Sequence, residues 1–106
     1  MSQTNGILTI NDDSFDNVIS QGTTIVDFWA PWCMPCRLQA PILENVSRKM
    51  GDKIKICKLN VDDNMRTAQK YQIVSIPTLI IFKDGQPDKI FVGVQDENTL
   101  IDSVEQ

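Results

Sequence analysis

The chain has 106 residues, the usual size of one folded domain, so we expect a single domain over 1–106. Its composition, 42% hydrophobic and 23% charged without a low-complexity tract, is that of an ordinary globular protein. The net charge of −4 and the lack of a Lys/Arg cluster argue against nucleic acid as a partner, and no apolar run approaches the roughly 20 residues that span a membrane.

The N-terminal segment and the cysteine count bear on the cellular compartment. Residues 1–6 are polar and uncharged, so they do not predict a secretory signal, which needs a basic region and an apolar core. Three cysteines are an odd number and do not suit a purely structural disulfide framework. We therefore expect a cytoplasmic protein in a reducing compartment.

The first half of the chain alternates strand and helix patterns. Residues 7–10 predict a short strand, and Asp12 or Asp13 can cap the short helix that follows. The segment 23–30 is β-branched and aromatic, and apolar on both faces, which predicts a central strand. A longer helix comes next, and its apolar residues recur at intervals of four: Leu38, Ile42, Val46 and Met50.

The second half adds a buried strand, a helix, a hairpin and a terminal helix. The strand is expected over 53–61, and the helix follows Asp63 or Asn64. The two strands of the hairpin are expected over 78–82 and 89–94, and the terminal helix starts at Asp96. The resulting order is β-α-β-α-β-α-β-β-α. Strand–helix alternation implies parallel pairing with helices on both faces, and the hairpin adds an antiparallel edge. We expect an α/β protein with a central mixed five-stranded sheet flanked by four helices.

The two cysteines after the central strand carry the chemistry. Cys33 and Cys36 stand in a C-x-x-C arrangement on the first turn of the predicted helix, where two thiols can close as a reversible disulfide. Cys33 lies nearest the helix N-terminus, where backbone N–H groups and the helix dipole favour an anion, so it is the expected nucleophile. Cys36, one turn further, is expected to be more shielded and to resolve a mixed disulfide.

Other uses of a cysteine pair fit this chain less well. A structural zinc ion needs four ligands, and the chain has no histidine and only one further cysteine, Cys57. A purely structural disulfide at this spacing constrains almost no loop. Cys57 lies within the predicted 53–61 strand and is expected to be buried and inert. The pattern favours redox chemistry, without a metal or cofactor.

A carboxylate and an amine stand on neighbouring predicted strands. Alternation puts Asp27 on the same face as Ile25 and Trp29, so it should be buried, which raises the pKa of a carboxyl toward values useful for proton transfer. Lys58 lies among apolar residues of the next strand. The residues themselves leave two interpretations of Lys58 open: a partner of Asp27, or a surface lysine whose stem covers apolar area.

Residues outside the cysteine motif predict a docking surface. Trp32 precedes Cys33 in a turn and should be partly exposed. Pro77 follows Ile76 at the entrance of a strand, where base rates favour a trans peptide bond. Gly93, at the end of the last strand, allows close backbone approach by a partner.

Several motifs stand in a specific order and spacing. They are Val26-Asp27-Phe28-Trp29-Ala30-Pro31-Trp32-Cys33 with Pro35-Cys36, then Pro41, Lys58-Leu59-Asn60-Val61-Asp62, Ile76-Pro77-Thr78, Phe82-Lys83-Asp84-Gly85 and Gly93. With them the sequence resembles the thioredoxin family along nearly its whole length. The resemblance implies the thioredoxin fold and a protein-disulfide reductase. It also implies a role in electron transport, with a flavin-dependent thioredoxin reductase as electron donor and disulfide-containing proteins as clients.

The resemblance also implies roles for particular residues. Lys58 would pair with Asp27, which would deprotonate Cys36. The Ile76–Pro77 bond would be cis and packed against the two cysteines, leaving the backbone of Ile76 free to pair with an extended substrate. The expected catalytic set is Cys33, Cys36, Asp27, Lys58 and Pro77, and the expected substrate-binding set is Trp32, Met34, Pro35, Ile76 and Gly93.

The chain departs from its family at Met34, where most thioredoxins have glycine. Methionine adds a flexible apolar side chain beside Cys33, so we expect an effect on docking more than on thiol stability. Disulfide oxidases and isomerases of the same fold have histidine before the second cysteine, where this chain has Pro35. A binding module with incidental redox chemistry is the other alternative, and the intact dithiol disfavours it. We expect a monomeric reductase.

Overall fold

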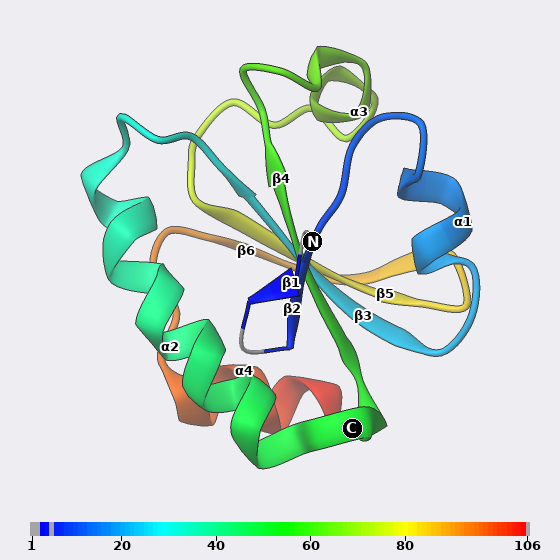
Figure 1. Cartoon of the computed structure of the whole chain (residues 1–106), viewed down its shortest axis with the longest axis vertical. Coiled ribbons are helices and arrows are strands. Elements are labelled where there is room, and N and C mark those ends of the chain that lie inside the picture. The colour runs from blue at the N-terminus through cyan, green and yellow to red at the C-terminus, as the bar shows by residue number, and fades with distance from the viewer. Residues whose placement is uncertain (1–2, 5, 106) are drawn as a thin grey trace.

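The computed structural model describes residues 3–4 and 6–105, and it forms a sheet covered by helices on both faces (Figure 1). The strands are β1 (Gln3–Thr4), β2 (Ile7–Thr9), β3 (Thr23–Trp29), β4 (Lys55–Asn60), β5 (Thr78–Lys83) and β6 (Gln86–Val92). The helices are α1 (Phe15–Ile19), α2 (Met34–Met50), α3 (Met65–Lys70) and α4 (Glu97–Val104), with a 3-10 turn at Gly51–Lys53. Among the described residues, no helix has the length and apolar character needed to cross a membrane.

The sheet has the order β1-β2-β4-β3-β5-β6. Strands β2, β4 and β3 run parallel, while β5 and β6 are antiparallel to their neighbours. The predicted mixed sheet and its four flanking helices are confirmed. A sixth strand, β1, pairs antiparallel with β2. It is only two polar residues long, so the sequence has no hydrophobic alternation there from which a strand could be predicted.

Two apolar layers hold the sheet between the helices. One layer packs α2 and α4 against the sheet through Ile25, Leu43, Val46, Ile56 and Leu100. The other packs α1 and the segment after α3 through aromatic rings: Phe15, Phe28, Tyr71 and Phe82. Because β3 lies between β4 and β5, its side chains face one layer or the other, and five of its seven residues are buried.

The core-facing side of α2 differs from the predicted one. Leu38 is 59% exposed, whereas Gln39, Leu43, Val46 and Met50 are buried. An α-helix turns about 100° per residue, so a residue four positions on is rotated by about 40° around the helix axis. Residues spaced strictly by four therefore wind around the helix and do not stay on one face. The observed intervals of four, three and four keep the buried residues on one side. Leu38 therefore belongs to the solvent-facing side.

The ends of the helices combine local and distant capping. Gly51 ends α2 with φ 57, as predicted, and Asp96 caps α4 by accepting the Thr99 N–H at 2.8 Å. The N-cap of α1 is Ser14 and not Asp12 or Asp13, so that prediction is wrong. Between β5 and β6, Asp84 and Gly85 both have positive φ, which is typical of the tight hairpin turn that the sequence predicted.

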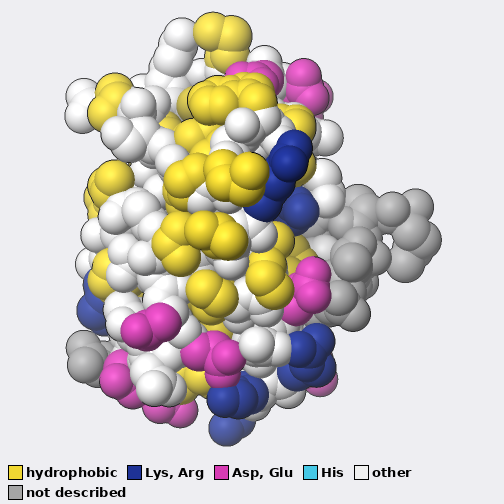
Figure 2. All heavy atoms as spheres, turned by 90° about the vertical axis from the view of Figure 1, so that its left-hand side faces the viewer, with side chains coloured by type: hydrophobic (Ala, Val, Ile, Leu, Met, Phe, Trp, Pro, Cys, Tyr) yellow, Lys and Arg dark blue, Asp and Glu magenta, His cyan; other side chains and the backbone are white. Residues whose placement is uncertain are grey.

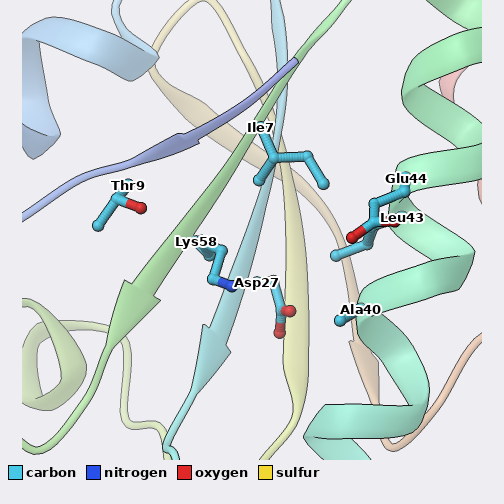
Figure 3. A pocket seen from close by; sticks show the side chains of 7 residues that line it. All are labelled: Ile7, Thr9, Asp27, Ala40, Leu43, Glu44 and Lys58. Atoms are coloured by element: carbon cyan, nitrogen blue, oxygen red, sulfur yellow. The ribbon is translucent and has the colours of Figure 1, made fainter. Parts of the chain in front are cut away.

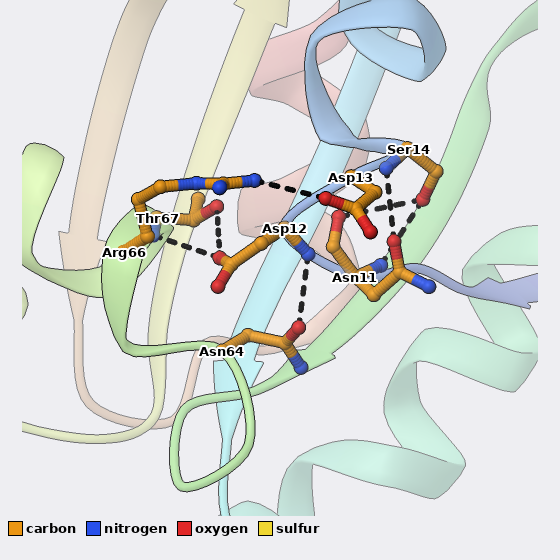
Figure 4. Close-up of polar contacts among 7 residues, drawn as sticks. All are labelled: Asn11, Asp12, Asp13, Ser14, Asn64, Arg66 and Thr67. Atoms are coloured by element: carbon orange, nitrogen blue, oxygen red, sulfur yellow. Dashed lines mark hydrogen bonds and ion pairs between the residues drawn. The ribbon is translucent and has the colours of Figure 1, made fainter.

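Asp12 instead caps a different helix (Figure 4). Its Oδ1 accepts the backbone N–H of Thr67 at 2.8 Å and the Thr67 hydroxyl at 2.6 Å, in the first turn of α3. Burial works against ionisation here, but the hydrogen bonds from Thr67, together with the backbone and charge of Arg66, outweigh it and lower the pKa of Asp12. In return, Asn64 Oδ1 accepts the N–H of Asp12 at 2.9 Å. This exchange fixes the loop that precedes α3 beside the β2–α1 loop.

Candidate active site around Cys33 and Cys36

The two motif cysteines lie where β3 gives way to α2. Cys33 is the N-cap of α2 with extended backbone (φ −90, ψ 111), and its Sγ accepts the N–H of Cys36 at 3.2 Å. The two cysteines form a disulfide with a Cα–Cα distance of 5.3 Å, within the usual range. The sulfur of Cys33 thus lies at the positive end of a 17-residue helix, where a thiolate is stabilised.

The relative burial of the two cysteines differs from expectation. Cys36 was expected to be more shielded, but both side chains are 4% exposed. With the disulfide closed, both cysteines cluster with Ala30, and Trp29, Val61 and Ile76 pack against this cluster. Ile76 comes from a loop distant in sequence, and its packing against the cysteines agrees with what the resemblance implied.

A second loop closes over the sulfurs. The Ile76–Pro77 peptide bond is cis, as the resemblance implied, and the carbonyl oxygen of Ile76 lies 3.7 Å from Cys33 Sγ. Gly93 has φ 91 and donates its N–H to the carbonyl of Pro77 at 2.8 Å. Three segments far apart in sequence therefore meet around the disulfide: the start of α2, the loop before β5 and the end of β6.

Apolar side chains are exposed beside the disulfide. Trp32 is 68% exposed, and its Nε1 donates to Asp62 Oδ2 at 2.9 Å. Met34, which opens α2, is 62% exposed, and Leu38 follows it one turn later. Figure 2 shows a band of apolar side chains down the face that carries α2. Sequence reasoning missed Asp62 as the partner of Trp32, because the bond joins two different loops.

Asp27 lies in β3 and is 3% exposed, so its predicted burial is confirmed. Burial raises the pKa of Asp27 to about 7, against the opposing positive charge of Lys58. Lys58 stands directly opposite Asp27 in the β3–β4 register, and its Nζ lies 4.5 Å from the centre of the Trp29 ring. Within the part of the chain that the structure describes, Asp27 Oδ1 has no hydrogen-bond partner.

The Asp27 carboxyl faces a cavity of about 90 Å³ between the sheet and α2 (Figure 3). Its lining residues are Ile7, Thr9, Asp27, Ala40, Leu43, Glu44 and Lys58. A second pocket, of about 230 Å³, is lined by both Asp27 and Cys36. Each is large enough for several water molecules. The carboxyl and the second cysteine therefore share a space in which water can carry a proton between them.

The third cysteine is remote from this chemistry. Cys57 is fully buried in β4 among apolar side chains, which confirms the prediction. Burial raises the pKa of the Cys57 thiol to about 11, although Lys55 acts in the opposite direction. A thiol in this state is unreactive at neutral pH.

The model of the thioredoxin family matches residues 6–106. The chain belongs to the thioredoxin family. It is 47% identical to the thioredoxin of Bacillus subtilis strain 168 over 94 residues, which cover 89% of this chain and 90% of that protein. It is 45% identical to the thioredoxin of Staphylococcus saprophyticus over 100 residues, covering 94% and 96% of the two chains.

A solved structure agrees with this family membership. The N21Q mutant thioredoxin from Halobacterium salinarum NRC-1 superposes with a TM-score of 0.87 at 31% identity, covering 99% of this chain and 93% of that one. Family membership and a cysteine pair at disulfide distance identify a thiol–disulfide oxidoreductase of the protein-disulfide reductase type.

Proposed function

We propose that Cys33 and Cys36 reduce client disulfides in two exchange steps. The Cys33 thiolate attacks one sulfur of the client disulfide, forming a mixed disulfide and releasing one client thiolate, which takes up a proton. The Cys36 thiolate then attacks Cys33 Sγ, the Cys33–Cys36 disulfide forms, and the second client thiolate leaves. The client gains two electrons, and the thioredoxin loses two.

One observation carries this assignment: Cys33 is the N-cap of α2, and its sulfur accepts the N–H of Cys36. That bond and the helix dipole favour the thiolate form of Cys33 before it attacks the client disulfide. Cys36 is held within bonding reach of Cys33. Intramolecular attack therefore outcompetes thiols from solution.

Asp27 is the proposed base that activates Cys36. Its pKa of about 7 suits proton transfer near neutral pH, and it shares a pocket with Cys36 that has room for water. The proton passes from the Cys36 thiol through water to the Asp27 carboxylate. Lys58 acts on Asp27 by its charge, which keeps the pKa of the carboxyl from rising further.

The proposed client-docking surface is the exposed rim of the disulfide. It consists of Trp32, Met34, Pro35, Ile76 and Gly93, with the cis Pro77 beneath. Strand β5 starts its paired register at Thr78, so the backbone of Ile76 lies just outside the sheet ladder. An extended client segment can pair with that backbone as an added strand, while its apolar side chains contact Trp32 and Met34.

We assign re-reduction to a flavin-dependent thioredoxin reductase, and the working compartment to the cytoplasm. Family membership supports the first assignment. The second follows from the chemistry, because a dithiol reductase turns over only where its cysteines are kept reduced. The protein would then act as a monomeric electron carrier between the reductase and its clients.

Dithiothreitol-driven reduction of insulin disulfides tests the proposal, followed by the same assay with a purified reductase and nicotinamide cofactor. The wild-type protein should accelerate insulin reduction, and Cys33→Ser should abolish the acceleration. Cys57→Ala is the matched control, since it removes a cysteine that the mechanism does not use. A wild-type rate equal to that of dithiothreitol alone would refute the function.

A further inference from the structure

Gln39 is a polar residue in the buried face of the redox helix. It lies one turn after Cys36 in α2 and is fully buried. Its side-chain amide makes two hydrogen bonds to the backbone of a single residue, Gln95. Gln39 Nε2 donates to the carbonyl of Gln95 at 3.0 Å, and Gln39 Oε1 accepts the N–H of Gln95 at 2.8 Å.

This pair of bonds gives Gln39 a specific partner. A buried amide costs free energy unless both its donor and its acceptor are satisfied, and an apolar side chain would fill the same face without that requirement. The amide of Gln39 reproduces the two-bond pairing of adjacent antiparallel strands. It therefore joins α2 to the segment between β6 and α4 in one fixed register.

The contacts continue from Gln95 to the disulfide. Gln95 Nε2 donates to the carbonyl of Gly93 at 3.2 Å, and the N–H of Gly93 donates to the carbonyl of Pro77 at 2.8 Å. The neighbouring Ile76 carbonyl lies 3.7 Å from Cys33 Sγ. The chain of contacts starts one turn beyond Cys36 and returns to Cys33.

We propose that Gln39 is a positioning residue that sets the distance between the redox helix and the Gly93 side of the docking surface. The inference rests on the docking surface proposed above. Among the described residues, the side-chain hydrogen bonds of Gln39 go to Gln95 and not to a sulfur, so Gln39 acts through the 93–95 segment and not on the exchange chemistry. Without the two bonds, the segment samples other positions, and only a fraction of molecules present a complete docking surface.

The variant Gln39→Met tests this, because methionine keeps the length of the side chain but forms neither bond. We expect the KM for insulin to rise about threefold or more, with kcat within about twofold of wild type, as a loss of two neutral hydrogen bonds permits. The second-order rate of the reduced protein with a small aromatic disulfide should stay unchanged, since that substrate does not reach Gly93. Amide exchange at Gln95 should accelerate.

Two further variants separate docking from stability. Val46→Ala removes buried volume two turns further along α2, within the core between α2 and the sheet, and should lower stability without changing the KM for insulin. Gln95→Ala cuts the side-chain links to the carbonyls of Gly93 and Val92 and should raise KM in the same direction as Gln39→Met. It decides the question if Gln39→Met does not fold.

The outcomes are distinct. An unchanged KM in Gln39→Met, or an equal rise in Val46→Ala, overturns the positioning role. When Gln39→Met does not fold, an unchanged KM in Gln95→Ala overturns it. Failure of the wild-type protein to reduce insulin overturns the proposed function instead.

Discussion

Asp27→Asn should change how the stability of the protein depends on pH. The pKa of Asp27 is about 7 in the folded protein, against 3.8 for an unperturbed aspartic acid carboxyl. Between these values the folded state binds one more proton than the unfolded chain, so the free energy of unfolding falls as pH rises from about 4 to about 7. At about 1.4 kcal/mol per pKa unit, the fall amounts to about 4 kcal/mol.

Asparagine fills nearly the same volume and does not titrate, so this contribution should vanish from the variant. Between pH 4 and pH 8, we expect the difference in unfolding free energy between Asp27→Asn and wild type to change by about 4 kcal/mol in favour of the variant. A constant effect of the new amide on stability does not alter this change. The comparison concerns the slope with pH and not the absolute stability. It therefore depends only on the titration of Asp27.

The assay is guanidinium denaturation of the disulfide form at unit pH intervals from 4 to 8. Asp13→Asn is the matched control, because Asp13 carries an exposed carboxylate paired with Arg66 and should change the profile little. Parallel wild-type and Asp27→Asn profiles over this range would contradict a raised pKa at Asp27. The assignment of Asp27 as base for Cys36 would fall with it.

Three further changes test the remaining parts of the site. Cys36→Ser should trap clients as mixed disulfides on Cys33, visible on non-reducing gels, and the absence of such adducts would argue against Cys36 as resolving thiol. Met34→Gly should alter kcat/KM with reductase and insulin by about threefold or more, while the redox potential moves by less than about 30 mV. A larger shift in potential with unchanged kinetics would contradict a role of Met34 in docking. Lys58→Met removes the positive charge that opposes the effect of burial on the pKa of Asp27, so the carboxyl should titrate above pH 7 in carbon-13 NMR. A downward shift of the pKa would show that Lys58 does not act on Asp27 electrostatically.

The local features of the site follow from residues close together in sequence. A C-x-x-C pair at the start of a helix puts the second N–H beside the first sulfur, because both lie within one helical turn. The Asp84-Gly85 turn and the Asp96 cap are equally local, since each is complete within four residues. Burial of Asp27 was predictable because strand alternation fixes its face.

Only the tertiary structure decided which residues meet across the fold. Asp12 caps α3 and not its own helix, and Gln39 turns inward where the sequence pattern favoured Leu38. The position of Gln95 opposite Gln39 depends on how α2 and the segment after β6 pack on the same sheet. A hydrogen bond between residues more than fifty positions apart depends on the packing of whole elements, and a local pattern carries no information about that packing.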